Sequence, residues 1–222
     1  MHIAETERRS KTRGTCPSRA TSLGGATAKC LCRIALLLLV SPSLAAQQTQ
    51  VTLDPAQTRI EWTLNDVLHT VHGTFKLKSG TISFDPASGT ARGLILVDAT
   101  SGQSGNQSRD KKMHKEILES QRYPEISFTP QHVIGNVTLS GNSTIQLQGV
   151  FHIHGSDHDL TLSVPVEIKG NEVKANTQFI VPYQQWGLKN PSTFLLRVEN
   201  NVAITVSAVG HLAASASTSA AQ

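Results

Sequence analysis

Apolar and polar residues alternate along most of the chain after residue 50. In residues 159–168, apolar side chains occupy every second position from Leu160 to Ile168. Because successive side chains of a strand point to opposite faces, this period of two predicts a strand with one buried face. The same reasoning predicts strands in further segments, which are residues 59–64, 71–77, 81–84, 91–99, 125–133, 144–153, 173–181 and 202–208.

Short turn sequences separate these segments. Asp85–Gly89 contains Pro86, which fixes φ, and a glycine that can take a positive φ. Gly170-Asn171 and Ser140–Asn142 predict hairpin turns, and Lys78–Gly80 predicts a bulge or bend. Eight or nine strands with short connections predict an all-β, antiparallel fold. An up-and-down barrel of about eight strands would hide every sheet edge, and a β-sandwich is the alternative.

One charged stretch, residues 105–129, interrupts the strand pattern. It predicts a short helix over about 108–119, capped by Ser108 and ended before Pro124. Met113 and Ile117 form an apolar stripe on it, and basic residues occupy its other faces. The helix is either a solvated lid or crossover, or a cover that closes one barrel end over an apolar ligand. In the second case its basic face would meet an anionic head group or a membrane surface.

The first 46 residues lack the alternating pattern and contain a short apolar run instead. Lys29 and Arg33 flank the start of an apolar run, residues 34–40, that is too short to span a bilayer. Small residues follow it, so we expect a signal peptide cleaved after Ala45 or Ala46 and a periplasmic or secreted protein. A disordered tail with a chance apolar patch is the alternative. The expected organisation is an N-terminal extension with signal peptide at 1–46, a barrel domain at 50–212 and a disordered tail at 213–222.

Charge and cysteine usage narrow the function classes. The net charge is +4, from 20 basic and 16 acidic residues, but residues 1–46 hold seven of the basic and two of the acidic ones. The remainder is therefore close to neutral, which removes the electrostatic argument for a nucleic-acid partner. All three cysteines also lie within residues 1–46, so the domain has no disulfide, thiol nucleophile or cysteine-based zinc site.

A cluster of histidines is the strongest candidate for a metal-binding site in the sequence. His152 and His154 are two residues apart on a predicted strand and would share one face, with His158 or Asp159 beyond the Gly155 turn as a third ligand. The strand phase places His152 and His154 outside the barrel, where ordinary surface residues are expected. We therefore predict no metal site, and a metal-binding or hydrolytic protein stays an alternative function. No G-x-S-x-G motif or phosphate-binding loop is present in the sequence.

Several motifs together resemble one family. The chain is similar to the YceI-like family of periplasmic polyisoprenoid-binding proteins over nearly all of residues 51–211. The segments that carry the resemblance are Asp54–Ile60 as an opening strand, His69–Phe75 with Ser79–Asp85, Asn106–Asp110 with Tyr123–Phe128, and Gln148–Gly155 with Leu160–Val166. Two features depart from the family pattern, namely the number of histidines and the segment Tyr183–Pro191.

The resemblance implies a lipocalin-like barrel that encloses a long isoprenoid chain, with binding rather than catalysis as its activity. The implied ligand is a polyisoprenoid or an isoprenoid quinone, and no cofactor is implied. Arg109 and Asp110 are the candidate polar groups at the mouth. Candidate ligand contacts, for which core packing is the alternative role, are Trp62, Phe75, Phe84, Met113, Ile117, Tyr123, Phe128, Phe151, Phe179 and Trp186.

Transient membrane contact is part of this expectation, and the sequence leaves homodimerisation open. A third hypothesis is a stress-response interaction module whose barrel is filled by side chains and holds no ligand. The presence or absence of an internal tunnel distinguishes that hypothesis from the lipid-binding one.

Overall fold

Nine antiparallel strands and one short helical segment make up the described part of the chain. The computed structural model describes residues 48–65, 69–192 and 197–213. The predicted signal peptide and nearly all of the predicted C-terminal tail lie outside these residues. The strands are β1 (Thr49–Leu53), β2 (Arg59–Asn65), β3 (Thr70–Phe84), β4 (Ala91–Gln103), β5 (Glu125–Ile134), β6 (Gly141–Ile153), β7 (Ser156–Lys169), β8 (Glu172–Val181) and β9 (Val202–Leu212).

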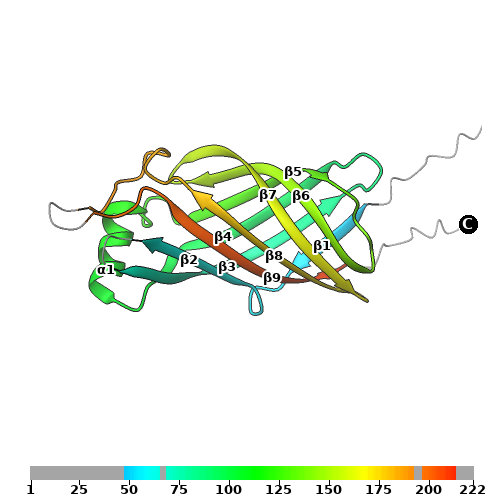
Figure 1. Cartoon of the computed structure of the whole chain (residues 1–222), viewed down its shortest axis with the longest axis horizontal. Helices are drawn as coiled ribbons and strands as arrows, with labels where there is room; N and C mark the ends of the chain where they lie inside the picture. Colours follow the sequence, from blue (N-terminus) through cyan, green and yellow to red (C-terminus); the bar gives the residue numbers. More distant parts are fainter. Residues whose placement is uncertain (1–47, 66–68, 193–196, 214–222) are drawn as a thin grey trace, which may run out of the picture. The chain divides into compact units, whose positions relative to one another are not determined.

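The sheet closes into a barrel of eight positions (Figure 1). Going round it, the order is β2-β9-β8-β7-β6-β5-β4-β3, and β3 pairs back onto β2. The ninth strand, β1, shares a position with β2, because both pair with β3 on one side and β9 on the other. The predicted all-β barrel is confirmed, and the sandwich alternative is wrong, because closure leaves no second sheet.

Most predicted turns are confirmed. The Gly89 amide donates to the Asp85 carbonyl at 2.9 Å, and Gly89 and Gly170 have φ values of +68° and +62°. The predicted irregularity near residues 78–80 is a register shift between β3 and β4 at Leu77/Ser79, inside one continuous strand. Residues 54–58 were expected to begin the opening strand, but they form a turn in which Asp54 accepts from the Ala56 amide at 2.8 Å.

The helical segment lies between β4 and β5. It begins as the α-helix α1 (Gln107–Lys112) and continues as the π-helix η1 (Met113–Ile117). Its N-cap is Asn106, not Ser108, because the Asn106 side chain accepts from the Arg109 amide at 3.0 Å. Of the helices in the described ranges, none has the length and apolar character needed to cross a bilayer. Figure 1 shows α1 at one end of the barrel, and the β3–β4 turn lies at the other end.

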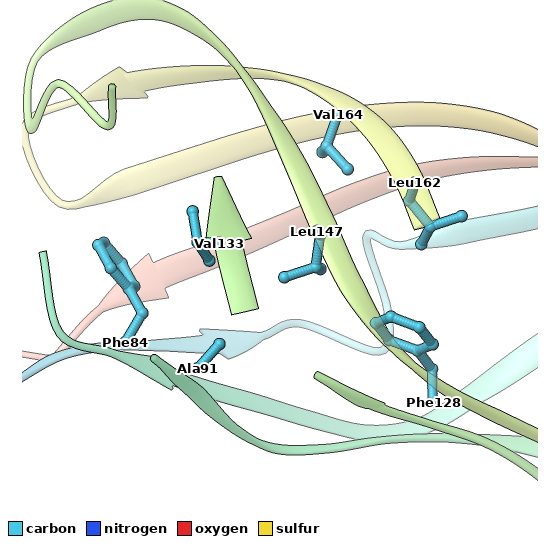
Figure 2. Close-up of a cluster of buried hydrophobic side chains, with 7 residues drawn as sticks. All are labelled: Phe84, Ala91, Phe128, Val133, Leu147, Leu162 and Val164. Carbon is cyan, nitrogen blue, oxygen red and sulfur yellow. The ribbon is translucent and has the colours of Figure 1, made fainter. Parts of the chain in front are cut away.

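Buried side chains form two clusters inside the barrel. One lies toward the end away from α1 and contains Phe84, Ala91, Phe128, Val133, Leu147, Leu162 and Val164 (Figure 2). The other lies toward α1 and contains Ala99, Leu118, Ile126, Ile153, Val181, Tyr183 and Leu188. Residues of both clusters line one internal cavity, and that cavity is the candidate site.

Candidate functional site

A cavity of about 620 Å³ lies inside the barrel. Alternation along the strands builds its wall, since every second residue points inward. On β7 the lining residues are Leu160, Leu162 and Val164, and on β9 they are Val202, Ile204 and Val206. Ligand pockets in proteins measure about 300–1,000 Å³ and are mostly apolar. The interior is therefore roomy enough for a ligand and is not filled by side chains.

The end of the barrel away from the helix is plugged. Phe84, Ala91 and Val133 are at least nine-tenths buried there and do not line the cavity, whereas Phe128 and Leu147 from the same cluster do (Figure 2). A hydrogen bond of 2.8 Å from the Val133 amide to the Gly89 carbonyl ties the strand ends together below them. The tunnel therefore has a closed, apolar bottom.

The other end is the mouth. Its lining comes from the helical segment, which contributes Ser108, Arg109, Lys112, Met113 and Ile117, and from the β8–β9 connection, which contributes Pro191 and Val198. Ser108 and Arg109 are exposed to solvent as well as part of the lining, so the cavity reaches the surface beside them. A ligand entering here would pass between the helix and the β8–β9 connection.

The π-helix brings the apolar stripe over the mouth. The Leu118 amide donates to the Met113 carbonyl at 2.9 Å, which is the i→i+5 bond of a π turn. This wider turn lets Met113, Ile117 and Leu118 all line the cavity. The sequence pattern identified the stripe but could not show the change of helix type.

His114 anchors the helical segment to the barrel wall. Its Nε2 lies 2.8 Å from the Gly102 carbonyl and its Nδ1 lies 3.0 Å from the Ser120 hydroxyl. A carbonyl only accepts, so Nε2 carries a proton and donates to Gly102, while Nδ1 and the Ser120 hydroxyl share the second hydrogen bond. Ser120 is 3% exposed, so both partners depend on this ring. Sequence analysis missed this residue.

Replacing His114 with Ala should destabilise the protein. The change leaves Ser120 and the Gly102 carbonyl without their partner, which costs about 1–3 kcal/mol for a buried polar group. Denaturant unfolding measures this loss. The matched control is His132→Ala, because His132 is exposed on β5 and should change the unfolding free energy by less than about 0.5 kcal/mol. Equal effects of the two substitutions would contradict the anchoring role.

A second polar framework orients Arg109. Its Nε donates to the Ser104 hydroxyl oxygen at 2.7 Å, and its Nη2 donates to the Ser104 carbonyl at 2.9 Å. Asp110 accepts from the Ser104 amide at 2.9 Å and also from the Ser104 hydroxyl. Asp110 does not line the cavity, so its observed role is to hold Ser104. Of the two polar groups expected at the mouth, Arg109 lies there and Asp110 supports it from behind.

Seven of the ten candidate ligand contacts line the cavity and three do not. Trp62, Phe75, Met113, Ile117, Phe128, Phe151 and Phe179 line the cavity. Phe84, Tyr123 and Trp186 do not line it. These three residues were predicted to contact the ligand, but they lie outside the cavity lining. Phe84 belongs to the plug, and Tyr123 packs on His154 with ring centroids 4.5 Å apart. Trp186 lies behind the wall, 5.7 Å from the Phe151 ring.

Sequence reasoning missed Lys112 and Tyr183, both of which line the cavity. Tyr183 is 4% exposed, and its hydroxyl donates to the Glu199 carbonyl at 2.6 Å. Burial raises the pKa of Tyr183 from 10.0 to about 12. This bond joins the two ends of the β8–β9 connection to each other. The three-residue spacing from Arg109 to Lys112 was the available signal for Lys112, since such positions share one side of a helix.

The Tyr183 pKa predicts a pH dependence of stability. The unfolded chain loses this proton near pH 10, whereas the folded protein keeps it until about pH 12. The stabilisation from Tyr183 is therefore fully present below pH 10 and is lost as the pH rises to about 12. Denaturant unfolding between pH 8 and 12 should show a smaller fall in Tyr183→Phe than in the unmodified protein. An identical fall in both proteins would contradict the assignment.

The three histidines of the metal alternative do not converge. His152 Nδ1 lies 2.5 Å from Asp157, and the His158 ring stacks on Trp186 at 4.0 Å. Strand β6 ends at Ile153, and His154 has a φ of +52° in the β6–β7 turn. The expectation that His152 and His154 share a strand face is therefore wrong. Within the described ranges, no group of three His, Cys, Asp or Glu side chains could hold a metal ion.

A family model for the YceI-like domain matches residues 51–210. The chain belongs to the YceI-like family. The matched range begins within β1 and ends within β9, so it includes strands β2 to β8 and the helical segment. None of the curated protein sequences compared with this chain matches it significantly.

Solved structures share the fold of this YceI-like protein. BcnA of Burkholderia cenocepacia is 16% identical with a TM-score of 0.58, over 71% of this chain and 98% of its own. A polyisoprenoid binding domain from Saccharophagus degradans, implicated in plant cell wall breakdown, is 12% identical with a TM-score of 0.56, over 73% and 98%. The YCEI protein of Campylobacter jejuni is 16% identical with a TM-score of 0.54, over 65% and 86%. At these identities the likeness shows a common fold.

Proposed function

We propose that this YceI-like protein binds the tail of an isoprenoid lipid, a polyisoprenoid or an isoprenoid quinone, inside its barrel. The observation that carries the proposal is the apolar tunnel that runs from the mouth beside Met113 to the plug at Phe84. A flexible apolar chain has the shape and chemistry to fill such a space. The structural similarity to the polyisoprenoid binding domain from Saccharophagus degradans supports the same ligand class.

The lining supports binding rather than catalysis. Among the described residues that line the cavity, there is no carboxylate, imidazole or thiol. General acid–base or nucleophilic chemistry commonly uses such groups. The polar lining groups are hydroxyls, such as those of Thr58 and Thr177, the indole N–H of Trp62 and the two cations at the mouth. We therefore propose sequestration or transport of an unchanged lipid.

Tail length gives a direct test of this proposal. Burial of a methylene is worth about 0.8 kcal/mol, and each isoprene unit contains two of them, so each added unit should raise affinity more than about tenfold until the tunnel is full. Geraniol, farnesol and geranylgeraniol form a suitable series in a fluorescence competition assay. Affinities that do not depend on tail length would count against a tunnel that holds the tail.

Location is a further part of the proposal. We propose export to the periplasm after cleavage near Ala45 or Ala46, on the basis of the apolar run at residues 34–40. Cell fractionation and N-terminal sequencing of the mature protein test this step. A mature chain that retains residues 1–46 in the cytoplasm would contradict it.

The outward basic residues suit transient membrane contact. Lys111 and Lys115 are exposed on the helical segment beside the mouth, where they would face anionic lipid head groups during loading or release. Co-sedimentation with anionic vesicles should weaken in a Lys111→Gln, Lys115→Gln variant. Binding that is independent of vesicle charge would argue against this contact.

A further inference from the structure

The barrel wall contains a seam between β7 and β8. A tight turn joins these two strands at the end away from α1 (Figure 1), and their ladder holds four residue pairs, of which Val166 with Ala175 is the last. Away from that turn, β7 stays paired with β6 and β8 stays paired with β9 to the ends of the strands. Within the described residues, 156–165 of β7 and 176–181 of β8 therefore have no ladder partner across the seam.

The sequence explains where the ladder stops. The β7 residue next to the last pair is Pro165, which has no amide hydrogen and so cannot donate to β8. A side-chain contact follows just past this point, because the Thr177 hydroxyl donates to the Ser163 carbonyl at 2.9 Å. The seam can therefore widen toward α1 without breaking a backbone ladder.

The seam opens onto the cavity. The inward side chains at its two edges line the cavity, namely Leu160 and Leu162 on β7 and Thr177 and Phe179 on β8. On the outer surface, Ile180 of β8 lies at the same edge and is 53% exposed. Apolar side chains thus lie on the inner and the outer side of the seam, and they form a path between the surface and the tunnel.

Aromatic rings cover the unpaired part of the seam. Phe179 of β8 meets Phe151 of β6 with ring centroids 6.0 Å apart. Trp186, in the β8–β9 connection, stacks on His158 of β7 at 4.0 Å and an interplanar angle of 6°. This stack, the Trp186–His158 clasp, joins the two edges. The His158 Nε2 is buried and has no hydrogen-bond partner among the described residues, so its hydration on opening offsets part of the lost stacking.

We propose that the seam is a lateral portal through which a lipid tail enters and leaves the barrel, and that the Trp186–His158 clasp keeps it shut. This inference rests on the proposed function, which supplies the ligand that passes. A long tail moves sideways into the tunnel along the seam, whereas entry at the mouth requires its whole length to thread past the helical segment. Trp186 is outside the cavity lining, so the clasp sets the rate of passage and contributes little to affinity.

Release kinetics test the portal. The protein is loaded with geranylgeraniol and mixed with an excess of phosphatidylcholine vesicles, and the ligand that stays on the protein is measured over time. An aromatic contact is lost in Trp186→Ala, which should release the ligand about fivefold faster. Its equilibrium affinity should stay within about twofold of the unmodified protein, because uptake also becomes faster. Trp186→Phe keeps a ring for stacking and should restore slow release.

His158→Ala removes the same stack from the β7 side. It should reproduce the faster release, which an effect confined to the β8–β9 connection would not do. The matched control is Tyr123→Ala, because Tyr123 packs on His154 with ring centroids 4.5 Å apart and is also outside the lining. That contact lies at the β6–β7 turn and does not join the edges of the seam, so the release rate should change by less than about twofold.

A reversible cross-link tests the opposite change. Continuing the register of the β7–β8 ladder places Ser163 opposite Gln178, and both residues are exposed. Ser163→Cys with Gln178→Cys, in a chain whose three native cysteines are replaced by Ser, allows a disulfide across the seam. The oxidised protein should release geranylgeraniol more slowly than the same protein after reduction.

The outcomes separate failure of the portal from failure of the proposed function. Unchanged release in both Trp186→Ala and His158→Ala, or an equal acceleration in Tyr123→Ala, would overturn the clasp and leave tail binding intact. Equal release from the oxidised and reduced forms of the cross-linked protein would overturn passage through the seam. An unmodified protein that takes up no geranylgeraniol would overturn tail binding itself, and the portal with it.

Discussion

Leu160→Trp is expected to abolish most of the binding of a long isoprenoid alcohol. Leu160 lines the cavity on β7, and its partner across the β6–β7 pair is Gly149. An indole at this position would project into the tunnel and exclude part of the ligand tail. Exclusion of two methylene groups removes about 1.6 kcal/mol of burial energy, which is more than a tenfold loss of affinity. Titration of geranylgeraniol measures the change.

Thr161→Trp is the matched control for this substitution. Thr161 is the next residue on β7, and its exposed side chain points to the outside of the barrel. The same indole placed there should change affinity by less than about twofold, since it does not reach the cavity. Thermal unfolding of both variants shows whether the barrel is intact. Equal losses in the two variants would mean that the tail does not lie along this wall.

Replacing Met113 and Ile117 together with Asp should cause a still larger loss, about a hundredfold or more. Both side chains line the cavity at the mouth, and a bound tail would cover them. Two carboxylates at these positions must either lose their hydration when the tail binds or keep water in the tunnel. A hundredfold loss corresponds to about 2.7 kcal/mol, which is well within the cost of burying unpaired charge.

Lys111→Gln with Lys115→Gln is the comparison for that double variant. These residues are on the same segment but are exposed and outside the lining. We expect farnesol affinity to stay within about twofold of the unmodified protein. The opposite order of effects would show that the basic face, and not the apolar stripe, retains the ligand.

The strands could be predicted because their signal is local. Alternation in residues 159–168 follows directly from which face of β7 is buried, and the turns at Gly89 and Gly170 follow from backbone geometry. Closure was predicted from the need to hide strand edges. The sharing of one barrel position by β1 and β2 could not be predicted, because it depends on pairings with β3 and β9 that are distant in sequence.

The candidate site was harder to predict than the fold. Alternation shows that a side chain points inward, but it does not show how deep in the barrel it lies. Phe84 and Phe128 have similar local patterns, yet Phe84 is part of the plug and Phe128 lines the tunnel. The difference depends on how side chains from several strands together fill the space. Sequence patterns could therefore propose an inner face but not the boundary of the cavity.

Contacts between segments that are distant in the sequence explain why two further residues lie elsewhere than predicted. His154 was expected on a strand face, but a positive φ turns it onto Tyr123. Lys112 belongs to the basic side of the helix, for which contact with water and contact with an anionic head group were both left open, but the β8–β9 connection comes within 3.4 Å of its Nζ at the Pro191 carbonyl. The spacing from Arg109 to Lys112 indicates a shared side of the helix, but neither contact itself has a short-range signal in the sequence. Both contacts join segments that are distant in the sequence.

Extraction of the purified protein tests the central claim most directly. The protein should be isolated from its own host under conditions that do not strip lipid, then extracted with organic solvent and analysed by mass spectrometry. We predict an isoprenoid lipid in near-stoichiometric amount, and much less of it in the Leu160→Trp variant purified in parallel. A protein that carries no isoprenoid and takes up none when it is offered would contradict the proposed function.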